Sequence, residues 1–268
     1  SIILSTVILY KRIGINALII GSVLAYVIQT VLLVINVRKY YSWSKPKSVI
    51  NQSTKELIKL IFPLLIGNGI YEINKLLDRY LASGLDIGVT TSLANSQIVL
   101  DSSSALFIVS ICSVLFAYLA TMVSEKREQE IKKQLLESTV ILLMIIIPYS
   151  MFLFVFSGDI IEVLFRHGNY SLQAAEITAW ILKGYCIGMP FLALREILMK
   201  VHYAYQDSKH PMINSTVAVI INMVVSIVLT KSIGAIGIAI GTSVSYTVCS
   251  LLLTVTVRKH CGKLEYGT

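Results

Sequence analysis

Two apolar runs near the end of the chain read INSTVAVIINMVVSIVLT (213–230) and IGAIGIAIGTSVSYTVCSLLLTVT (233–256), with only two residues between them. A helix needs roughly 20 mainly apolar residues to cross the hydrocarbon core of a bilayer, and each run has about that length. Neither run shows the two-residue alternation of a membrane β-strand. They therefore predict two adjacent membrane-spanning helices.

Comparable runs extend back to the start of the chain. In chain order they cover 1–10, 15–37, 58–83, 91–123, 138–157 and 173–205. Because a helix satisfies its backbone hydrogen bonds within its own segment, it is the form that runs of this length take in lipid. We predict an all-α, polytopic membrane bundle with about seven complete spans and one truncated span.

The composition agrees with a membrane protein. Of 268 residues, 55% are hydrophobic and 14% are charged, and the mean hydropathy is +0.75. Soluble domains carry about 25% charged residues, so a soluble enzyme domain is excluded, as is a nucleic-acid interpretation of the net charge of +8. The chain begins with Ser1 inside an apolar run, so we expect a piece of a longer protein.

Lysine and arginine lie unevenly on the two sides of the predicted bundle. The loops 38–59, 124–137 and 206–212, together with the tail from 257, carry fourteen of them, and the other side carries four. The positive-inside rule makes the richer side cytoplasmic. The protein is therefore predicted to be a multi-pass membrane protein with these loops and the tail in the cytoplasm.

An internal repeat relates 11–40 to 231–260. Aligned without gaps, the two stretches share 11 of 30 positions, among them Gly14/Gly234 and Tyr26/Tyr246. Parallel repeats build many secondary transporters, with the substrate path between the halves. We predict that 1–40 ends one lobe, that 41–57 is a cytoplasmic linker, and that 58–268 is a second lobe of six helices with a cytoplasmic tail.

Local signals mark two helix starts. Ser53 and Glu56 have the spacing of a capping box, which places a helix start near Thr54. On the outer side, SGDIIEVLFRHGNYS (157–171) is too short and polar to span, so we predict a surface helical turn that Gly168 ends. Ser171 is expected to cap the helix that follows.

Catalytic and metal-binding patterns are missing from the sequence. The four histidines, His167, His202, His210 and His260, do not have metal-ligand spacing, and the chain has no Gly-rich phosphate loop. The four cysteines form no CxxC pair and are expected to be small buried hydrophobes. We therefore expect a protein that is not an enzyme and uses neither nucleotide nor cofactor, driven by sodium ions or the membrane potential.

Charged side chains inside the predicted spans are the functional candidates, because a charge in lipid is costly and normally faces a cavity. The basic ones are Lys75, Arg79, Lys183, Arg195 and Lys200, and the acidic ones are Glu72, Asp78, Asp101, Glu176 and Glu196.

The first group lies on YEINKLLDRYLAS (71–83), where Tyr71, Asn74 and Asp78 form one helical stripe. This stripe indicates a polar cavity face with Asp78 as a cation or proton site. The alternative is that the charges sit at the outer end of the helix and reach water.

The second group, TSLANSQIVLDSSS (91–104), is too polar for lipid and is expected to face a water-filled interior. Asp101 there either pairs with a basic residue of another helix or is satisfied by the neighbouring serines.

Arg195 is the strongest single candidate for binding an anionic group. Glu196 and Lys200 have i, i+4 spacing and can pair with each other, which leaves Arg195 without a local partner near mid-span. Guanidinium offers a two-pronged donor to phosphate. The competing interpretation is an interhelical salt bridge, for example with Asp101.

Polar residues also mark the last two runs. Asn222 and Ser226 lie i, i+4 on one run, and Thr242 and Ser245 lie on the next. Interhelical packing explains them adequately, and a small oxygen-lined cation site is the sharper alternative.

Several stretches together resemble the MurJ (MviN) family of lipid II flippases, in the multidrug/oligosaccharidyl-lipid/polysaccharide exporter superfamily. They are INKLLDRYLASGL (73–85), VLFRHGNYS (163–171), GMPFLALREILMKVHYAYQDSKHP (188–211) and SIGAIGIAIGTSVS (232–245). Family members have fourteen helices in two lobes, and this chain resembles helices five to twelve.

The resemblance implies export of a polyprenyl-pyrophosphate-linked cell-wall precursor, lipid II, for peptidoglycan synthesis. The headgroup would enter a cationic cavity that alternately opens to either side, while the lipid tail stays in the membrane. The expected substrate-binding residues are Arg195, Lys200, Arg79, Asp101 and Gln97. By the same resemblance, a sodium site is implied at Asp78, Asn222, Ser226, Ile238 (through its carbonyl) and Thr242.

The sequence departs from the family pattern at two places. Ser226 stands where some members have an acid, and LANSQIV (93–99) has Ile98 or Gln97 where the family has a cavity arginine. An exporter of another lipid-linked polysaccharide, or a cation-coupled drug exporter, is therefore an alternative. A non-transporting scaffold or degenerate remnant is an alternative of another class.

Overall fold

The computed structural model describes residue 14 and residues 16–38, 52–168 and 170–261. All the regular elements in these ranges are helices, as predicted. The chain divides into two units, Ser1–Thr54 and Lys55–Thr268. The predicted run 1–10 and most of the predicted linker lie outside the described residues, so these two predictions, and the lobe boundaries built on them, remain predictions.

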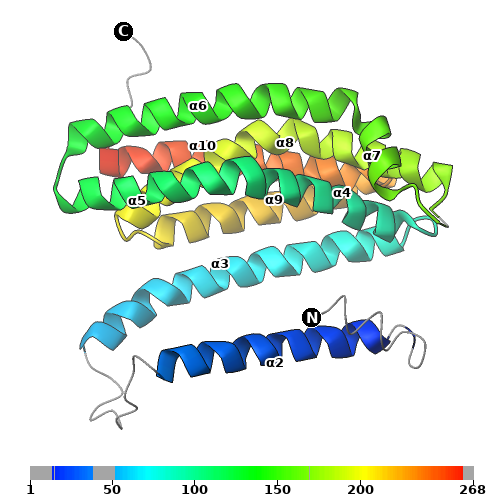
Figure 1. Cartoon of the computed structure of the whole chain (residues 1–268). Coiled ribbons are helices and arrows are strands. Elements are labelled where there is room, and N and C mark those ends of the chain that lie inside the picture. The colour runs from blue at the N-terminus through cyan, green and yellow to red at the C-terminus, as the bar shows by residue number, and fades with distance from the viewer. Residues whose placement is uncertain (1–13, 15, 39–51, 169, 262–268) are drawn as a thin grey trace. The chain divides into compact units, whose positions relative to one another are not determined.

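The helices follow the predicted apolar runs closely (Figure 1). Their bounds are α2 Asn16–Arg38, α3 Gln52–Ser83, α4 Val89–Ser103, α5 Ser110–Ser124, α6 Glu128–Val155, α7 Ser157–Phe165, α8 Leu172–Ala204, α9 Lys209–Ile233 and α10 Ile236–Cys261. A π-helical segment, η1 (Ser104–Val109), joins α4 to α5 without a break.

Six helices in the described part of the chain are long and apolar enough to cross a membrane, with α4, η1 and α5 acting as one span. The protein is thus a polytopic membrane protein. Helix α3 has 32 residues and sufficient length, but its composition is less apolar because both of its halves carry charged residues. The further span at 58–83 therefore remains a prediction from the sequence.

The first unit contains α2, whose start repeats the start of α10. Gly14 and Gly234 both have a positive φ, +54° and +66°, and each lies two residues before its helix. The amide of Ala17 donates to the Gly14 carbonyl, and the equivalent amide of Gly237 donates to the Gly234 carbonyl, both at 3.0 Å. A positive φ favours glycine, so the repeat preserves a defined turn as well as apolar character.

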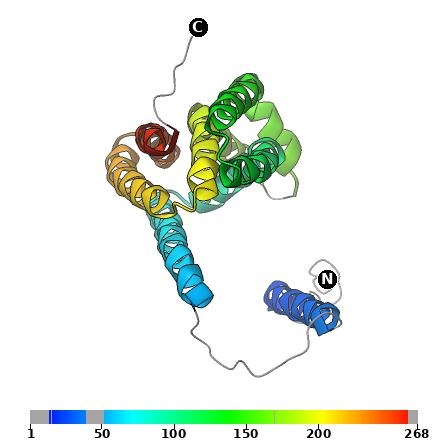
Figure 2. The same cartoon turned by 90° about the vertical axis from the view of Figure 1, so that its left-hand side faces the viewer.

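Helix α8 is the centre of the second unit. It packs against α4, α5, α6 and α7 on one side and against α10 on the other, and α9 packs on α10 (Figure 2). The buried share of its most apolar stretch is larger than in the other candidate spans of the described residues. The core accordingly follows α8, with Ile181, Met189 and Ile197 almost fully buried.

Glycines allow α8, α9 and α10 to approach closely. A Cβ at Gly188 would lie 2.7 Å from the Ser243 Cα, and one at Gly237 would lie 2.5 Å from the Leu229 carbonyl carbon. Small residues at such contacts let backbones meet, which supplies packing where lipid removes the hydrophobic driving force. Across the first of these contacts, the Ser243 hydroxyl donates to the Gly184 carbonyl at 2.7 Å.

The outer segment folds as the sequence predicts. Helix α7 is nine residues long and ends before Gly168, which has φ +65°. The Ser171 hydroxyl then accepts a hydrogen bond from the Ala174 amide at 3.1 Å and caps α8. Cys112, Cys186 and Cys249 are free and buried, as expected.

Candidate functional site

A cavity of about 390 Å³ lies inside the second unit. Residues from α3, α4, η1, α8, α9 and α10 line it, so segments distant in the sequence meet there. Its ionisable lining residues include three basic and three acidic side chains, which are Lys75, Arg195, Lys200, Asp78, Asp101 and Glu196. The volume falls in the range of small-molecule sites.

The predicted stripe on α3 faces this cavity. Tyr71, Asn74 and Asp78 all line it, and the side chains of Asn74 and Asp78 are buried. The Asn74 amide donates to Asp78 Oδ2 at 3.2 Å. Asp78 is therefore inside the bundle, and the alternative that it reaches water beyond the helix end is not what the structure has.

Arg195 also lies at the cavity, from the second half of α8. Its Nη1 is 3.3 Å from Glu196 Oε1, and the guanidinium carbon is 5.9 Å from the centre of the Tyr246 ring. Its side chain is only 18% exposed. Glu196 thus pairs with its neighbour Arg195 and not with Lys200, and the pair expected between Arg195 and Asp101 is not formed.

The other expected substrate-binding residues divide into two groups. Lys200, Asp101 and Gln97 line the cavity with Arg195. Arg79 does not line it, and its side chain is exposed one residue beyond Asp78. A helical step of about 100° turns Arg79 away from the stripe that carries Asp78.

The expected cation-site residues of α9 and α10 form one hydrogen-bonded group. Asn222 Nδ2 donates to Thr242 Oγ1 at 3.3 Å, and the Ser226 hydroxyl donates to Asn222 Oδ1 at 2.9 Å. The Thr242 hydroxyl donates to the Ile238 carbonyl at 3.2 Å. Asn222 and Thr242 line the same cavity as Asp78, so the cavity brings both parts of the expected site together.

Two buried oxygens on α3 have no hydrogen-bond partner, Asn74 Oδ1 and Asp78 Oδ1. Buried acceptors are normally satisfied, so such a pair needs an explanation, and a bound cation is one. Oxygen-only donors suit a hard cation. The residues present therefore fit a sodium ion, with Asn74 as an additional ligand that its i, i+4 spacing from Asp78 could have indicated.

Tyr246 lines the cavity, although the sequence marked it only as a position of the internal repeat. Its ring lies beneath the Arg195 guanidinium and is 8% exposed. The repeat partner, Tyr26, marks the position as shared, but the pairing with an arginine of another helix requires the fold. The face of an aromatic ring attracts a nearby guanidinium electrostatically, so Tyr246 helps to hold Arg195 in this position.

Comparison with known proteins agrees with the fold. A family described as "Lipid II flippase MurJ" matches residues 1–267. A probable lipid II flippase MurJ of Treponema pallidum (strain Nichols) is 27% identical over 213 residues, covering 80% of this chain and 40% of that protein. A probable lipid II flippase MurJ of Borreliella burgdorferi is 26% identical over an aligned length of 270, covering 98% and 52%.

A solved structure, "Lipid II flippase MurJ, inward closed conformation", has the same fold. It superimposes with a TM-score of 0.76 at 24% identity, covering 96% of this chain and 53% of the other. The chain spans about half the length of the curated relatives it matches. The family match extends over nearly every residue, and the chain belongs to the lipid II flippase MurJ family.

Proposed function

We propose that the chain is part of a flippase that carries lipid II, a polyprenyl-pyrophosphate-linked cell-wall precursor, across the bacterial cytoplasmic membrane for peptidoglycan synthesis. The observation that carries this proposal is the position of Arg195, a mostly buried guanidinium on the wall of an intramembrane cavity. An ionisable residue inside a membrane is a functional candidate by default.

The contacts of Arg195 suit an anionic ligand. Glu196 contacts the guanidinium at Nη1, and the Tyr246 ring lies near the guanidinium carbon. The remaining N–H groups of Arg195 can donate to a pyrophosphate oxygen. Lys75 and Lys200 line the same cavity, and neither forms an ion pair within the part of the chain that the structure describes. With Arg195 they place three cationic donors for a pyrophosphate headgroup on the wall of a cavity that three acidic side chains also line.

The test is complementation of a flippase-depleted strain by the full-length protein. Arg195→Ala is expected to abolish growth while its level in the membrane stays normal, and Arg195→Lys, which keeps charge but loses the fork, is expected to complement weakly. The matched control is Arg166→Ala, because Arg166 is an exposed arginine beyond α7 paired with Glu162. Full complementation by Arg195→Ala would remove this residue from the site.

We further propose that sodium drives the cycle through the α3–α9–α10 site. When bound, the ion supplies a positive charge between the Asp78 carboxylate and the hydroxyl and carbonyl oxygens of α9 and α10. Asp78 and Asn74 would hold it from α3, and Asn222 and Thr242 from the other two helices. Binding would thus tie α3 to the α9–α10 pair within the second unit.

A further inference from the structure

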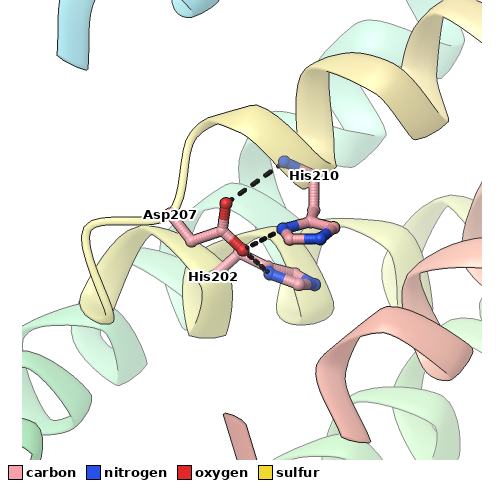
Figure 3. Close-up of side chains that lie close together, drawn as sticks. All are labelled: His202, Asp207 and His210. Atoms are coloured by element: carbon pink, nitrogen blue, oxygen red, sulfur yellow. Dashed lines mark hydrogen bonds and ion pairs between the residues drawn. The ribbon is translucent and has the colours of Figure 1, made fainter. Parts of the chain in front are cut away.

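Two histidines and one aspartate meet at the turn between α8 and α9. His202 lies in the last turn of α8, Asp207 in the connecting loop and His210 in the first turn of α9 (Figure 3). Asp207 Oδ2 is 2.9 Å from His202 Nδ1 and 2.7 Å from His210 Nδ1. One ligand atom from each residue lies within 4.8 Å of the others.

The cluster is organised by contacts around it. The His210 amide donates to Asp207 Oδ1 at 3.1 Å, which fixes the carboxylate at the start of α9. His202 is fully buried, and its Nε2 lies 3.2 Å from Thr256 Oγ1 on α10. Both Nδ1 atoms therefore converge on one carboxylate oxygen, and the three residues come from a short, firmly held segment.

The hydrogen bonds of Thr256 bear on which ring nitrogen of His202 carries a proton. The Thr256 hydroxyl has one hydrogen, and the Leu252 carbonyl one turn before it, at 3.1 Å, is the usual acceptor for a helical threonine. Asn214 Nδ2 donates to the same hydroxyl oxygen at 3.0 Å. In the arrangement where its hydrogen is used in this way, Thr256 accepts from His202 Nε2, which lies 3.2 Å away, and His202 Nδ1 faces Asp207 with its lone pair.

A lone pair that faces a carboxylate needs a positive charge between them. Either a second proton makes His202 a buried imidazolium, or a metal ion takes the place of the proton. Metal-bound histidines commonly donate their other ring N–H to an oxygen, and Thr256 Oγ1 lies 3.2 Å from His202 Nε2.

We propose that His202, Asp207 and His210 bind a divalent transition-metal ion of the zinc type. Two imidazole nitrogens and one carboxylate oxygen are the ligand set of three-ligand zinc sites, which keep a fourth position for water. Calcium and magnesium prefer oxygen ligands in larger number. The ligand side chains of Asp207 and His210 are 13% and 33% exposed, which provides a path of entry.

Lys259 carries a positive charge that would repel a metal ion bound at this site. Its Nζ is 3.2 Å from His210 Nε2, and its side chain is exposed on the last turn of α10. When His210 Nδ1 binds the metal, the ring proton moves to Nε2, so the ammonium must swing into water. The turn is on the predicted cytoplasmic side, where solvent accommodates that movement.

The metal would hold the ends of α8 and α9 together, separately from the substrate cavity. None of the three ligands lines that cavity, although the neighbouring Ser208 and Pro211 do. The proposal therefore stands apart from lipid II transport. Spacing in the sequence gave no sign of it because the two histidines are eight residues apart and approach only through the turn.

The test is zinc binding by purified full-length protein in detergent after chelator treatment, followed by titration calorimetry. One zinc ion per chain is expected, and cobalt substitution should give the visible absorption of a four-coordinate nitrogen–oxygen site. His210→Gln should weaken binding by more than the roughly 10–100-fold that loss of an outer partner costs, and Thr256→Val should fall within that range. His167→Gln, at an exposed histidine on the outer side, should bind as the wild type does.

Thermal unfolding separates loss of the site from loss of the fold. His210 is partly exposed, so His210→Gln should unfold near the wild-type temperature without zinc and gain nothing when zinc is added. Arg195→Ala should keep zinc binding whatever its effect on transport. Absence of saturable binding by the wild type, or equal binding by His210→Gln, would overturn the proposal and leave a hydrogen-bonded cluster only.

Discussion

Asp78 is the residue whose surroundings most require a ligand. It is 7% exposed and shares with Asn74 a pair of oxygens that no donor reaches. A carboxylate in a membrane protein interior is retained only where something compensates it. The hydroxyl and amide groups of α9 and α10 across the cavity complete an oxygen environment that a small cation fits.

Sodium should therefore stabilise the protein through Asp78. An ion that binds only the folded state adds about 2.7 kcal/mol when present at 100 times its dissociation constant. In purified full-length protein, replacing choline by sodium is expected to raise the unfolding temperature of the wild type and leave Asp78→Asn unchanged. Asp159→Asn, at an exposed aspartate on α7, is the control and should respond as the wild type does. An equal sodium response in Asp78→Asn would contradict the assignment.

Individual site residues were predictable where spacing alone decided their position. The stripe of Tyr71, Asn74 and Asp78 follows from one helix, and the structure has it at the cavity. Partners were not predictable in this way. The i, i+4 rule shows that Glu196 can reach Lys200, but in the structure the Glu196 carboxylate pairs with the Arg195 guanidinium beside it.

At the scale of elements, α4 and α8 are joined through hydroxyl groups. The Ser96 hydroxyl is fully buried and donates to the Thr178 carbonyl at 2.7 Å, and Ser92 donates to the Ala174 carbonyl at 3.2 Å. The polar residues of 91–104 thus have two roles, contact with α8 and lining of the cavity. The serines pack against α8, while Gln97 and Asp101 face the cavity.

Ser96→Leu is expected to destabilise the α4–α8 contact. The larger side chain has no space at a fully buried position, and overpacking costs about 1–3 kcal/mol. The lost interhelical hydrogen bond adds about 0.6 kcal/mol. Thermal unfolding in detergent measures the effect, and Ser113→Leu is the control because Ser113 is exposed and its hydroxyl donates to the Val109 carbonyl one turn earlier, at the end of η1. Equal unfolding temperatures for the two variants would show that the contact is not stabilising.

Apolar runs predicted which helices exist better than where they end. Helix α6 begins at Glu128, ten residues before the predicted run from 138, because EQEIKKQLLE (128–137) is a polar helix end that extends beyond the lipid. Helix α3 begins at Gln52, two residues before the predicted start. The π-helical segment η1 was not predictable, since its backbone pattern depends on packing and has no signal in hydropathy.

At the scale of the whole molecule, the repeat and the charge asymmetry were the informative signals. The repeat is visible in the structure as matching glycine turns before α2 and α10. The packing around α8 was not predictable, because a hydrophobic helix surface does not specify its neighbours in lipid, where contacts are decided by small residues and polar groups. The same limit explains why the turn between α8 and α9 brings His202 to His210 without a sequence signal.

The measurement that tests lipid II transport most directly is the accessibility of lipid II to a reagent outside the cell. Cells depleted of their own flippase should accumulate lipid II in the inner leaflet, protected from the reagent. Expression of the full-length wild-type protein should restore exposure of the precursor, and Arg195→Ala at equal membrane level should not. If lipid II stays protected while the wild-type protein is present in the membrane, the proposed transport of lipid II is contradicted.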